Sequence, residues 1–172
     1  MKRTIVDFLC LIIAFAIQHC IFPFIPFLSA APNLVLILVF SYAFIYGSKD
    51  GMFYGLVAGI FLDLFYSYSF GFFTLAFIWI GYVNGLLNAY YYEEYIIFPI
   101  TLCVFNEVFY NIYIYFFRFF VRGKTDILFY IKDIILPEMI ITLLMTLLIY
   151  RLFLIYNRKL EVLDEKRSIN VI

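Results

Sequence analysis

The stretch "GMFYGLVAGIFLDLFYSYSFG" (residues 51–71) decides what kind of fold this chain can adopt. It spaces three glycines and one acid four residues apart in an otherwise apolar run: Gly51, Gly55, Gly59 and Asp63. Side chains four residues apart share one face of an α-helix, so these positions form a single stripe. Glycine is a poor helix former, and a carboxylate is costly to place in an apolar medium. We therefore expect the stripe to pack against another segment, which the glycines allow to approach closely and which provides hydrogen bonds to the carboxylate.

The composition indicates the medium in which this helix lies. The 172-residue chain is 66% hydrophobic and only 14% charged, whereas a soluble domain is about half apolar and about a quarter charged. One water-soluble core of this size cannot hide so much apolar surface, so the composition predicts an integral membrane protein. The formal net charge is zero, which provides no basic surface for nucleic acid.

Six apolar runs predict an all-α fold with six transmembrane helices in a single domain, residues 1–156. Backbone groups cannot remain unpaired in lipid, so these runs must be helical. The predicted spans are residues 4–22, 33–46, 52–66, 70–88, 96–120 and 137–156, followed by a cytoplasmic tail at 157–172. The second and third spans are short against the ~20 residues of a straight crossing. We therefore expect them to be incomplete spans or to be shielded by their neighbours.

The basic residues near the ends of the predicted helices favour an orientation with both termini in the cytoplasm. A cleaved signal peptide is the alternative interpretation of the first apolar run. The length of that run, and its polar Asp7, Gln18 and His19, favour an uncleaved first helix. With six spans, the cytoplasmic side receives Lys2, Arg3, Lys49, Arg151, Arg158, Lys159, Lys166 and Arg167, and the outer side receives Arg118, Arg122, Lys124 and Lys132.

The glycine stripe predicts a helix-packing or partner interface. Glycines at every fourth position leave a groove that lets another helix approach closely. Asp63 continues this stripe, so its carboxylate should face the neighbouring helix, where hydrogen bonds offset its desolvation. Gly55 and Gly59 form the firm pair, whereas Gly51 is the member that could belong to the preceding turn instead.

A second cluster of polar residues occurs in "NEVFYNIYIYFFR" (residues 106–118) within the fifth predicted span. Four of its members follow one another at steps of four, four and three residues, which places them near one helix face. Together with an asparagine on the fourth span, they predict an intramembrane polar seam. Its members are Asn84, Asn106, Glu107, Asn111, Tyr115 and Arg118.

The connection before the last span predicts two further features. The apolar positions of "TDILFYIKDIILPE" (residues 125–138) share a helical face, which is typical of a short helix in the outer interface. Glu138 follows Pro137 and is expected at the N-terminal end of the last helix, where the helix dipole favours a carboxylate.

The sequence contains no arrangement that indicates catalysis. No serine has a recognisable nucleophile context, no acidic pair has metal-ligand spacing and no phosphate-binding loop occurs. We therefore predict no enzyme activity, no catalytic residue, no cofactor and no metal. The intramembrane acids fit either a structural seam or a small-ligand site.

The order of these features resembles the family of the rod shape-determining protein MreD. The resemblance is carried by Pro32-Asn33 before the second helix, the "YGSKDG" turn (46–51), the glycine-spaced third helix ending in Asp63-Leu64, and Phe70-Gly71 before the fourth helix. The segments "NEVFYNIYIYFFR" and "ILPEMIITLLMTLLIYRLF" (135–153) are also similar to members from clostridia-like Gram-positive bacteria. The similarity covers nearly the whole chain.

The resemblance implies a non-enzymatic component of the machinery that builds the lateral cell wall, in the bacterial cytoplasmic membrane. Implied partners are MreC, RodA, a class B penicillin-binding protein, the MreB filaments and the lipid bilayer. The family also looks similar in fold to the six-helix substrate-binding components of vitamin transporters. This likeness provides the alternative function, a small-molecule binding component of a transporter, whose outward cavity would involve Asn84, Glu107 and Asn111. A membrane-embedded enzyme is the third hypothesis and lacks a nucleophile, a base or a metal set.

Overall fold

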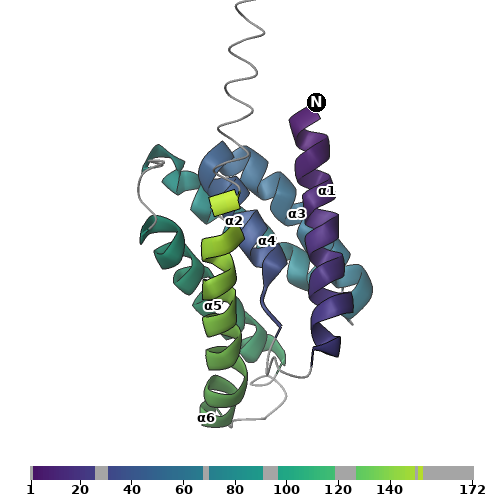
Figure 1. Cartoon of the computed structure of the whole chain (residues 1–172), viewed down its shortest axis with the longest axis vertical. Helices are drawn as coiled ribbons and strands as arrows, with labels where there is room; N and C mark the ends of the chain where they lie inside the picture. Colours follow the sequence, from purple (N-terminus) through teal and green to yellow (C-terminus); the bar gives the residue numbers. More distant parts are fainter. Residues whose placement is uncertain are drawn as a thin grey trace, which may run out of the picture.

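The computed structural model describes residues 2–25, 31–67, 70–90, 97–118, 127–149 and 151–152. Within these ranges every secondary-structure element is helical, and the chain forms six successive helical segments (Figure 1). This confirms the predicted all-α fold. The predicted tail at 157–172, and the basic residues of the outer connection at 122 and 124, lie outside the described residues.

The first segment, α1 (Lys2–Ala16), continues through a π-helical turn (Ile17–Ile21) and a 3₁₀ turn (Phe22–Phe24). Proline explains the change of geometry, because Pro23 lacks the N–H group that an α-helix needs and its ring crowds the preceding turn. The amide of Phe22 accordingly donates to the carbonyl of Ile17, a five-residue step.

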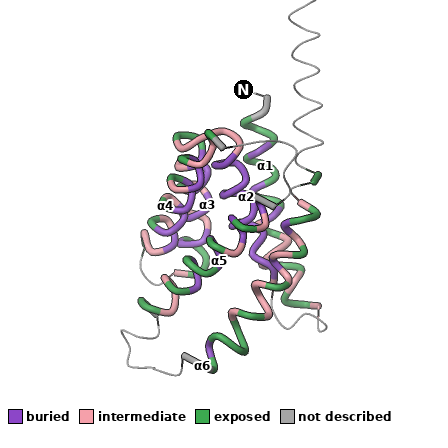
Figure 2. The backbone as a smooth tube through the Cα atoms, turned by 90° about the vertical axis from the view of Figure 1, so that its left-hand side faces the viewer, coloured by how far each residue is buried: buried purple, intermediate pink, exposed green. Residues whose placement is uncertain are grey.

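Helix α2 (Leu34–Tyr46) lies at the centre of the bundle and is surrounded by the other helices (Figure 2). Its residues from Leu34 to Phe44 are all buried. A helix that is apolar all round belongs in a core rather than at a boundary. With 13 residues it is shorter than a full crossing, and its neighbours shield it as the sequence predicted.

Helices α3 (Ser48–Tyr66) and α4 (Phe72–Leu86) form the tightest hairpin of the molecule. The "GSKDG" segment was expected to separate the second and third helices, but a single residue does so. Gly47 has a φ angle of 94°, in the left-handed region that glycine adopts without strain. Ser48, Lys49 and Asp50 then form the first turn of α3, so Gly51 lies inside the helix and not in the turn.

The last two segments are α5 (Ile97–Arg118) and a helix that comprises α6 (Ile127–Tyr130), a π-helical segment (Ile131–Ile135) and residues 136–149. The predicted short interfacial helix is therefore not separate from the last span. Pro137 again explains the π segment, because it has no N–H group to donate to the carbonyl of Asp133. The backbone hydrogen bonds before it therefore join residues five positions apart instead of four. The amide of Leu136 donates to Ile131.

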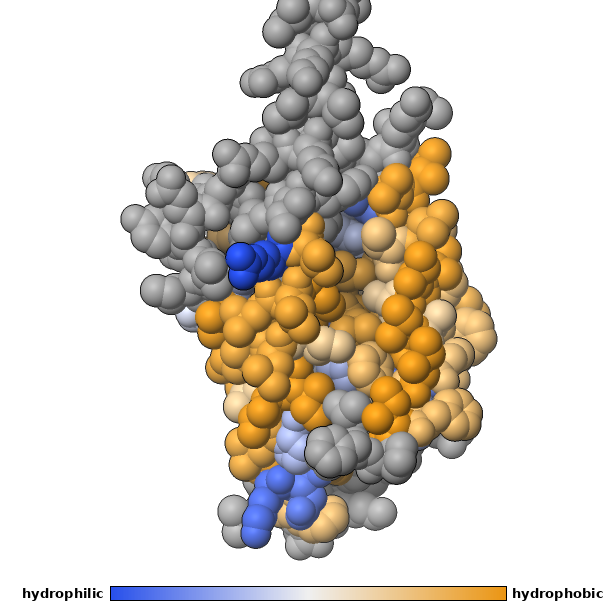
Figure 3. Space-filling model, viewed as in Figure 1, coloured by the Kyte–Doolittle hydropathy of each residue, from blue (hydrophilic) through white to orange (hydrophobic). Residues whose placement is uncertain are grey.

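The outer surface has the apolar band expected of a membrane protein. Hydrophobic side chains cover most of the face shown in Figure 3, whereas hydrophilic residues gather toward its two ends. Among the residues that the structure describes, three helices are long and apolar enough to cross a membrane: Thr4–Phe24, Phe72–Ala89 and Pro99–Phe117. The beginning of α1 and the end of the 136–149 helix lie at the same end of the bundle (Figure 1).

Candidate functional site

The glycine stripe of α3 packs against α4 of the same chain. A Cβ atom added to Gly55 would overlap the backbone carbonyl of Phe77, and one added to Gly59 would overlap the backbone of Thr74. Across the contact, α4 contributes its own glycines, because Cβ atoms on Gly81 and Gly85 would overlap the backbone at Gly51 and Ser48. The two backbones therefore touch along the whole length of the hairpin, which only glycine allows.

Asp63 binds the N-terminal end of α4. Its carboxylate accepts hydrogen bonds from the backbone N–H groups of Gly71, Phe73 and Thr74 at 3.0, 2.8 and 2.9 Å, and a further one from the Thr74 hydroxyl. The first N–H groups of a helix have no partner within it, and they carry the positive end of its dipole. Asp63 is only 3% exposed, so these four donors offset the cost of its burial.

Other polar side chains complete the ends of the buried helix α2. At its beginning, the side chain of Asn33 accepts from the amide of Leu36, and the amide oxygen of Gln18 accepts from the amide of Val35. At its end, Asn88 donates to the carbonyls of Phe44 and Ile45, both at 2.8 Å. These contacts let a short helix end inside the bundle without unpaired backbone groups.

Asn84 and Asn106 of the predicted seam form a reciprocal pair between α4 and α5. Each side-chain amide donates to the other's oxygen, at 2.7 and 2.9 Å. Each also donates to the carbonyl four residues earlier in its own helix, Ile80 or Leu102, at 2.7 Å. The pair is buried and its N–H donors are all used, so it holds two helices together and leaves no amide N–H for a ligand.

Glu107 and Asn111 continue the seam toward the other end of α5. Glu107 is fully buried, and one of its carboxylate oxygens accepts from Asn111 at 3.1 Å. Among the described residues, its other oxygen, Oε1, has no hydrogen-bond partner. Tyr115 lies further along and packs its ring on that of Tyr130, with centroids 5.2 Å apart. The side chain of Arg118, the predicted charged end of the seam, lies outside the described residues.

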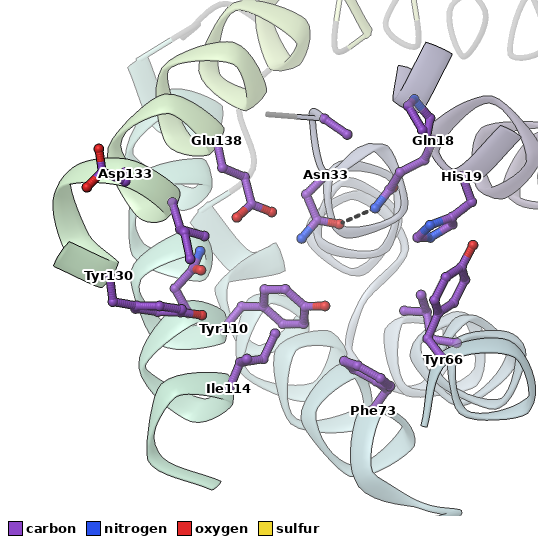
Figure 4. A pocket seen from close by; sticks show the side chains of 15 residues that line it. Gln18, His19, Asn33, Tyr66, Phe73, Tyr110, Ile114, Tyr130, Asp133 and Glu138 are labelled. Atoms are coloured by element: carbon purple, nitrogen blue, oxygen red, sulfur yellow. Dashed lines mark hydrogen bonds between the residues drawn. The ribbon is translucent and has the colours of Figure 1, made fainter. Parts of the chain in front are cut away.

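A cavity of about 520 Å³ opens at this end of the bundle (Figure 4). All six helical segments contribute to its wall, because α1, α3 and α5 end there and α2, α4 and the last helix begin there. Its polar lining includes residues to which the sequence analysis gave no site role. The polar and aromatic lining residues are Gln18, His19, Asn33, Tyr66, Phe73, Tyr110, Asn111, Tyr130, Asp133 and Glu138.

Glu138 occupies a different place from the one expected. Because the last helix continues back to Ile127, Glu138 lies well inside it and cannot interact with a free helix N-terminus. Its carboxylate instead points into the cavity, toward Asn33 (Figure 4). The capping interpretation of Glu138 is therefore wrong. The apolar face of residues 127–135 signalled a helix, but nothing in the local sequence signalled that it passes through Pro137.

Of the predicted site residues, the structure thus brings Gly51, Gly55, Gly59 and Asp63 onto α4, and Asn84 onto Asn106. Among the seam members whose side chains are described, Asn111 alone lines the cavity. Asp7 is a further buried acid, 1% exposed, that the site prediction missed. It accepts a hydrogen bond from the hydroxyl of Tyr54 on α3 at 3.2 Å.

Comparison with known protein families gives one match. The family model for the rod shape-determining protein MreD matches residues 1–160. The chain belongs to the MreD family. No curated protein and no solved structure matches the chain.

Membership of the MreD family confirms the resemblance described above, and it connects the chain to the determination of rod shape. Together with the three helices that can cross a membrane, it makes the chain a membrane protein of the cell-shape system. The helix-end contacts described above then explain how such a member keeps several polar side chains within an apolar bundle.

Proposed function

We propose that the protein is a non-enzymatic scaffold of the cell-elongation machinery, which binds MreC and helps to direct lateral peptidoglycan synthesis. The match of the MreD family model to residues 1–160 carries this proposal. RodA, a class B penicillin-binding protein and the MreB filaments are the further partners that membership of this family suggests.

The internal packing supports a scaffold whose partners dock on its outer helix faces. The Gly51, Gly55, Gly59 and Asp63 stripe is occupied by α4, so its role in a complex is to hold the α3–α4 hairpin rigid. Apolar side chains that remain exposed cover the outside of the helices. They include Leu9 on α1, Trp79 on α4, Ile112 on α5 and Leu144 on the last helix.

In the orientation that fits this function, both termini lie in the cytoplasm and the protein lies in the bacterial cytoplasmic membrane. Two observations support the orientation. The first turn of α1 contains Lys2 and Arg3, and the described end of the last helix, which contains Arg151, lies at that same end of the bundle (Figure 1). The cavity then lies near the outer surface.

The decisive experiment is site-specific photo-crosslinking in the native host, followed by purification in mild detergent. The crosslinking residue is placed at Leu9, Trp79, Ile112 or Leu144, which are 53–60% exposed, and at Ala58, which is fully buried, as the control. We expect a crosslink to MreC from one or two faces and none from Ala58. If no face captures MreC while the protein still supports rod shape, the proposal is wrong.

The cavity favours a second candidate function, the small-molecule binding component of a transporter. Such a protein works with membrane and ATPase subunits. The same purification distinguishes the two candidates, because recovery of an ATPase pair with a membrane coupling subunit, in place of MreC, would support the transporter.

A further inference from the structure

We propose that the cavity at the outer end of the bundle binds a primary ammonium group, in addition to any scaffold role. Its volume of about 520 Å³ falls within the range of about 300–1,000 Å³ that is typical of small-molecule sites. The glycine stripe and the Asn84–Asn106 pair are not among its lining residues. The α3–α4 hairpin contributes Leu62, Tyr66 and Phe73 to the wall.

The first argument concerns charge. Glu138 directs its carboxylate into the cavity (Figure 4), and Glu107 lies close enough to interact with it electrostatically. Asp133 adds a third acid to the wall, although its side chain points away from the centre (Figure 4). None of the lining residues that the structure describes is a lysine or an arginine. A cavity with acids and no basic residue attracts a cation.

The second argument is the unsatisfied oxygen of Glu107. Its carboxylate is fully buried, and Oε1 has no hydrogen-bond partner among the described residues. A buried acceptor without a donor is costly. Asn111 connects the two acids, since it donates to Glu107 and also lines the cavity. Glu107 does not itself line the cavity, so an ammonium group, with its several N–H donors, would bind beside Glu138 and Asn111 and would interact with Glu107 through Asn111.

The third argument is the aromatic wall. Tyr66, Phe73, Tyr110 and Tyr130 line the cavity from α3, α4, α5 and α6. The electron-rich faces of such rings attract cations, and the attraction is stronger where water is excluded. Figure 4 shows the rings of Tyr110 and Phe73 below the carboxylate of Glu138. Acid and aromatic groups therefore surround the same space, which is the arrangement that selects an ammonium group over an anion.

The ammonium group could belong to a lipid headgroup or to a soluble amine, and the test distinguishes them. The full chain is purified in detergent and its thermal unfolding is followed as ethanolamine is added, with ethylene glycol as the uncharged probe. A ligand that binds only the folded state raises the unfolding midpoint. In parallel, the protein is placed in nanodiscs of phosphatidylglycerol with and without phosphatidylethanolamine, and bound lipid is measured by native mass spectrometry.

We expect stabilisation by ethanolamine but not by ethylene glycol, selective retention of phosphatidylethanolamine, or both. Retention of the lipid alone assigns the site to a headgroup, and a response to ethanolamine alone assigns it to a soluble amine. Glu138→Gln should weaken binding about tenfold or more, because it removes the charge that faces the ligand. Asp50→Asn removes an acid that is exposed and lies outside the cavity, so it should leave binding unchanged.

The proposal fails if ethanolamine and ethylene glycol act alike and phosphatidylethanolamine is not retained. This outcome is read on the unmodified chain and does not depend on the folding of a variant. Equal binding by Glu138→Gln and the unmodified protein would also overturn it. Neither result bears on crosslinking to MreC, so the ammonium site and the scaffold function can fail separately.

Discussion

The α3–α4 hairpin and the cavity end of the bundle each contain buried carboxylates, but these carboxylates differ in how many hydrogen-bond donors they have. Asp63 accepts four hydrogen bonds from the beginning of α4, whereas Glu107 keeps one buried oxygen without a partner among the described residues. The hairpin is packed backbone against backbone, whereas Glu138 faces open space. A buried acid that has all its donors supports structure, whereas Glu138, which lines the cavity, is available to a ligand.

This comparison predicts that the hairpin tolerates change least. Gly59→Leu should destabilise the protein by more than about 3 kcal/mol, because even a Cβ atom at this position would overlap the backbone of Thr74. The change is measured as the loss of monodisperse folded protein on heating and size-exclusion chromatography. We expect little or no folded protein to remain at physiological temperature.

Phe65→Leu on the same helix is the matched control, because Phe65 is 67% exposed and its ring contacts Phe15 of α1. Its effect on the unfolding temperature should be small. If Gly59→Leu unfolds at the same temperature as Phe65→Leu, close packing of the hairpin does not stabilise the bundle, and the contrast between the two regions disappears.

The next effect in size concerns the charge of Asp63. Asp63→Asn should lower the free energy of unfolding by about 2 kcal/mol, because it replaces an acceptor of charge-assisted hydrogen bonds by an amide with only one acceptor oxygen. The Nδ2 group of asparagine would also face N–H donors of α4. Thermal unfolding of the purified variant provides the measurement, and Asp50→Asn is the control for loss of one negative charge. Equal stability of the two variants would contradict the assigned contacts.

A smaller effect is expected at the asparagine pair. Asn84→Ala leaves the amide of Asn106 buried without its partner. It should lower the free energy of unfolding by about 1–2 kcal/mol. Replacing both residues by leucine removes both polar groups together. The resulting loss of unfolding free energy should be smaller than the sum of the losses caused by the two single substitutions. A double-mutant cycle of unfolding free energies measures this coupling. Strict additivity would show that the two amides do not depend on one another.

The sequence predicted the parts of this structure that depend on short-range periodicity. Glycines at every fourth residue indicated close helix contact, and Asp63 on the same stripe indicated a carboxylate that faces a neighbour. The boundaries next to proline were harder to predict. The first helical segment ends at Phe24, close to the end that Pro23 suggested. Pro137 suggested a helix start, but a π-helical segment before it lets the helix continue, so the last helix begins ten residues before the predicted start.

The cavity could not be predicted because it depends on tertiary structure. Gln18, Asn33 and Glu138 are far apart in the chain, and each has an ordinary local explanation as an interfacial or capping residue. They meet only because six helices converge at one end. Likewise, Asn84 looked like a ligand candidate, since a sequence shows that an amide is intramembrane but not that a second amide, here Asn106, already satisfies it.

The smallest expected effect provides the sharpest test of the comparison. Glu138→Gln should change the free energy of unfolding by no more than about 0.5 kcal/mol, although Glu138 and Asp63 are both acids inside the bundle. The amide has nearly the same size as the carboxylate, and its neutrality removes repulsion from the nearby Glu107. Thermal unfolding of this variant, measured beside Asp63→Asn without added amine, shows whether Glu138 stabilises the fold as Asp63 does. A loss of unfolding free energy as large as that of Asp63→Asn would mean that Glu138 holds helices together. The acids of the two regions would then differ in geometry but would both stabilise the fold.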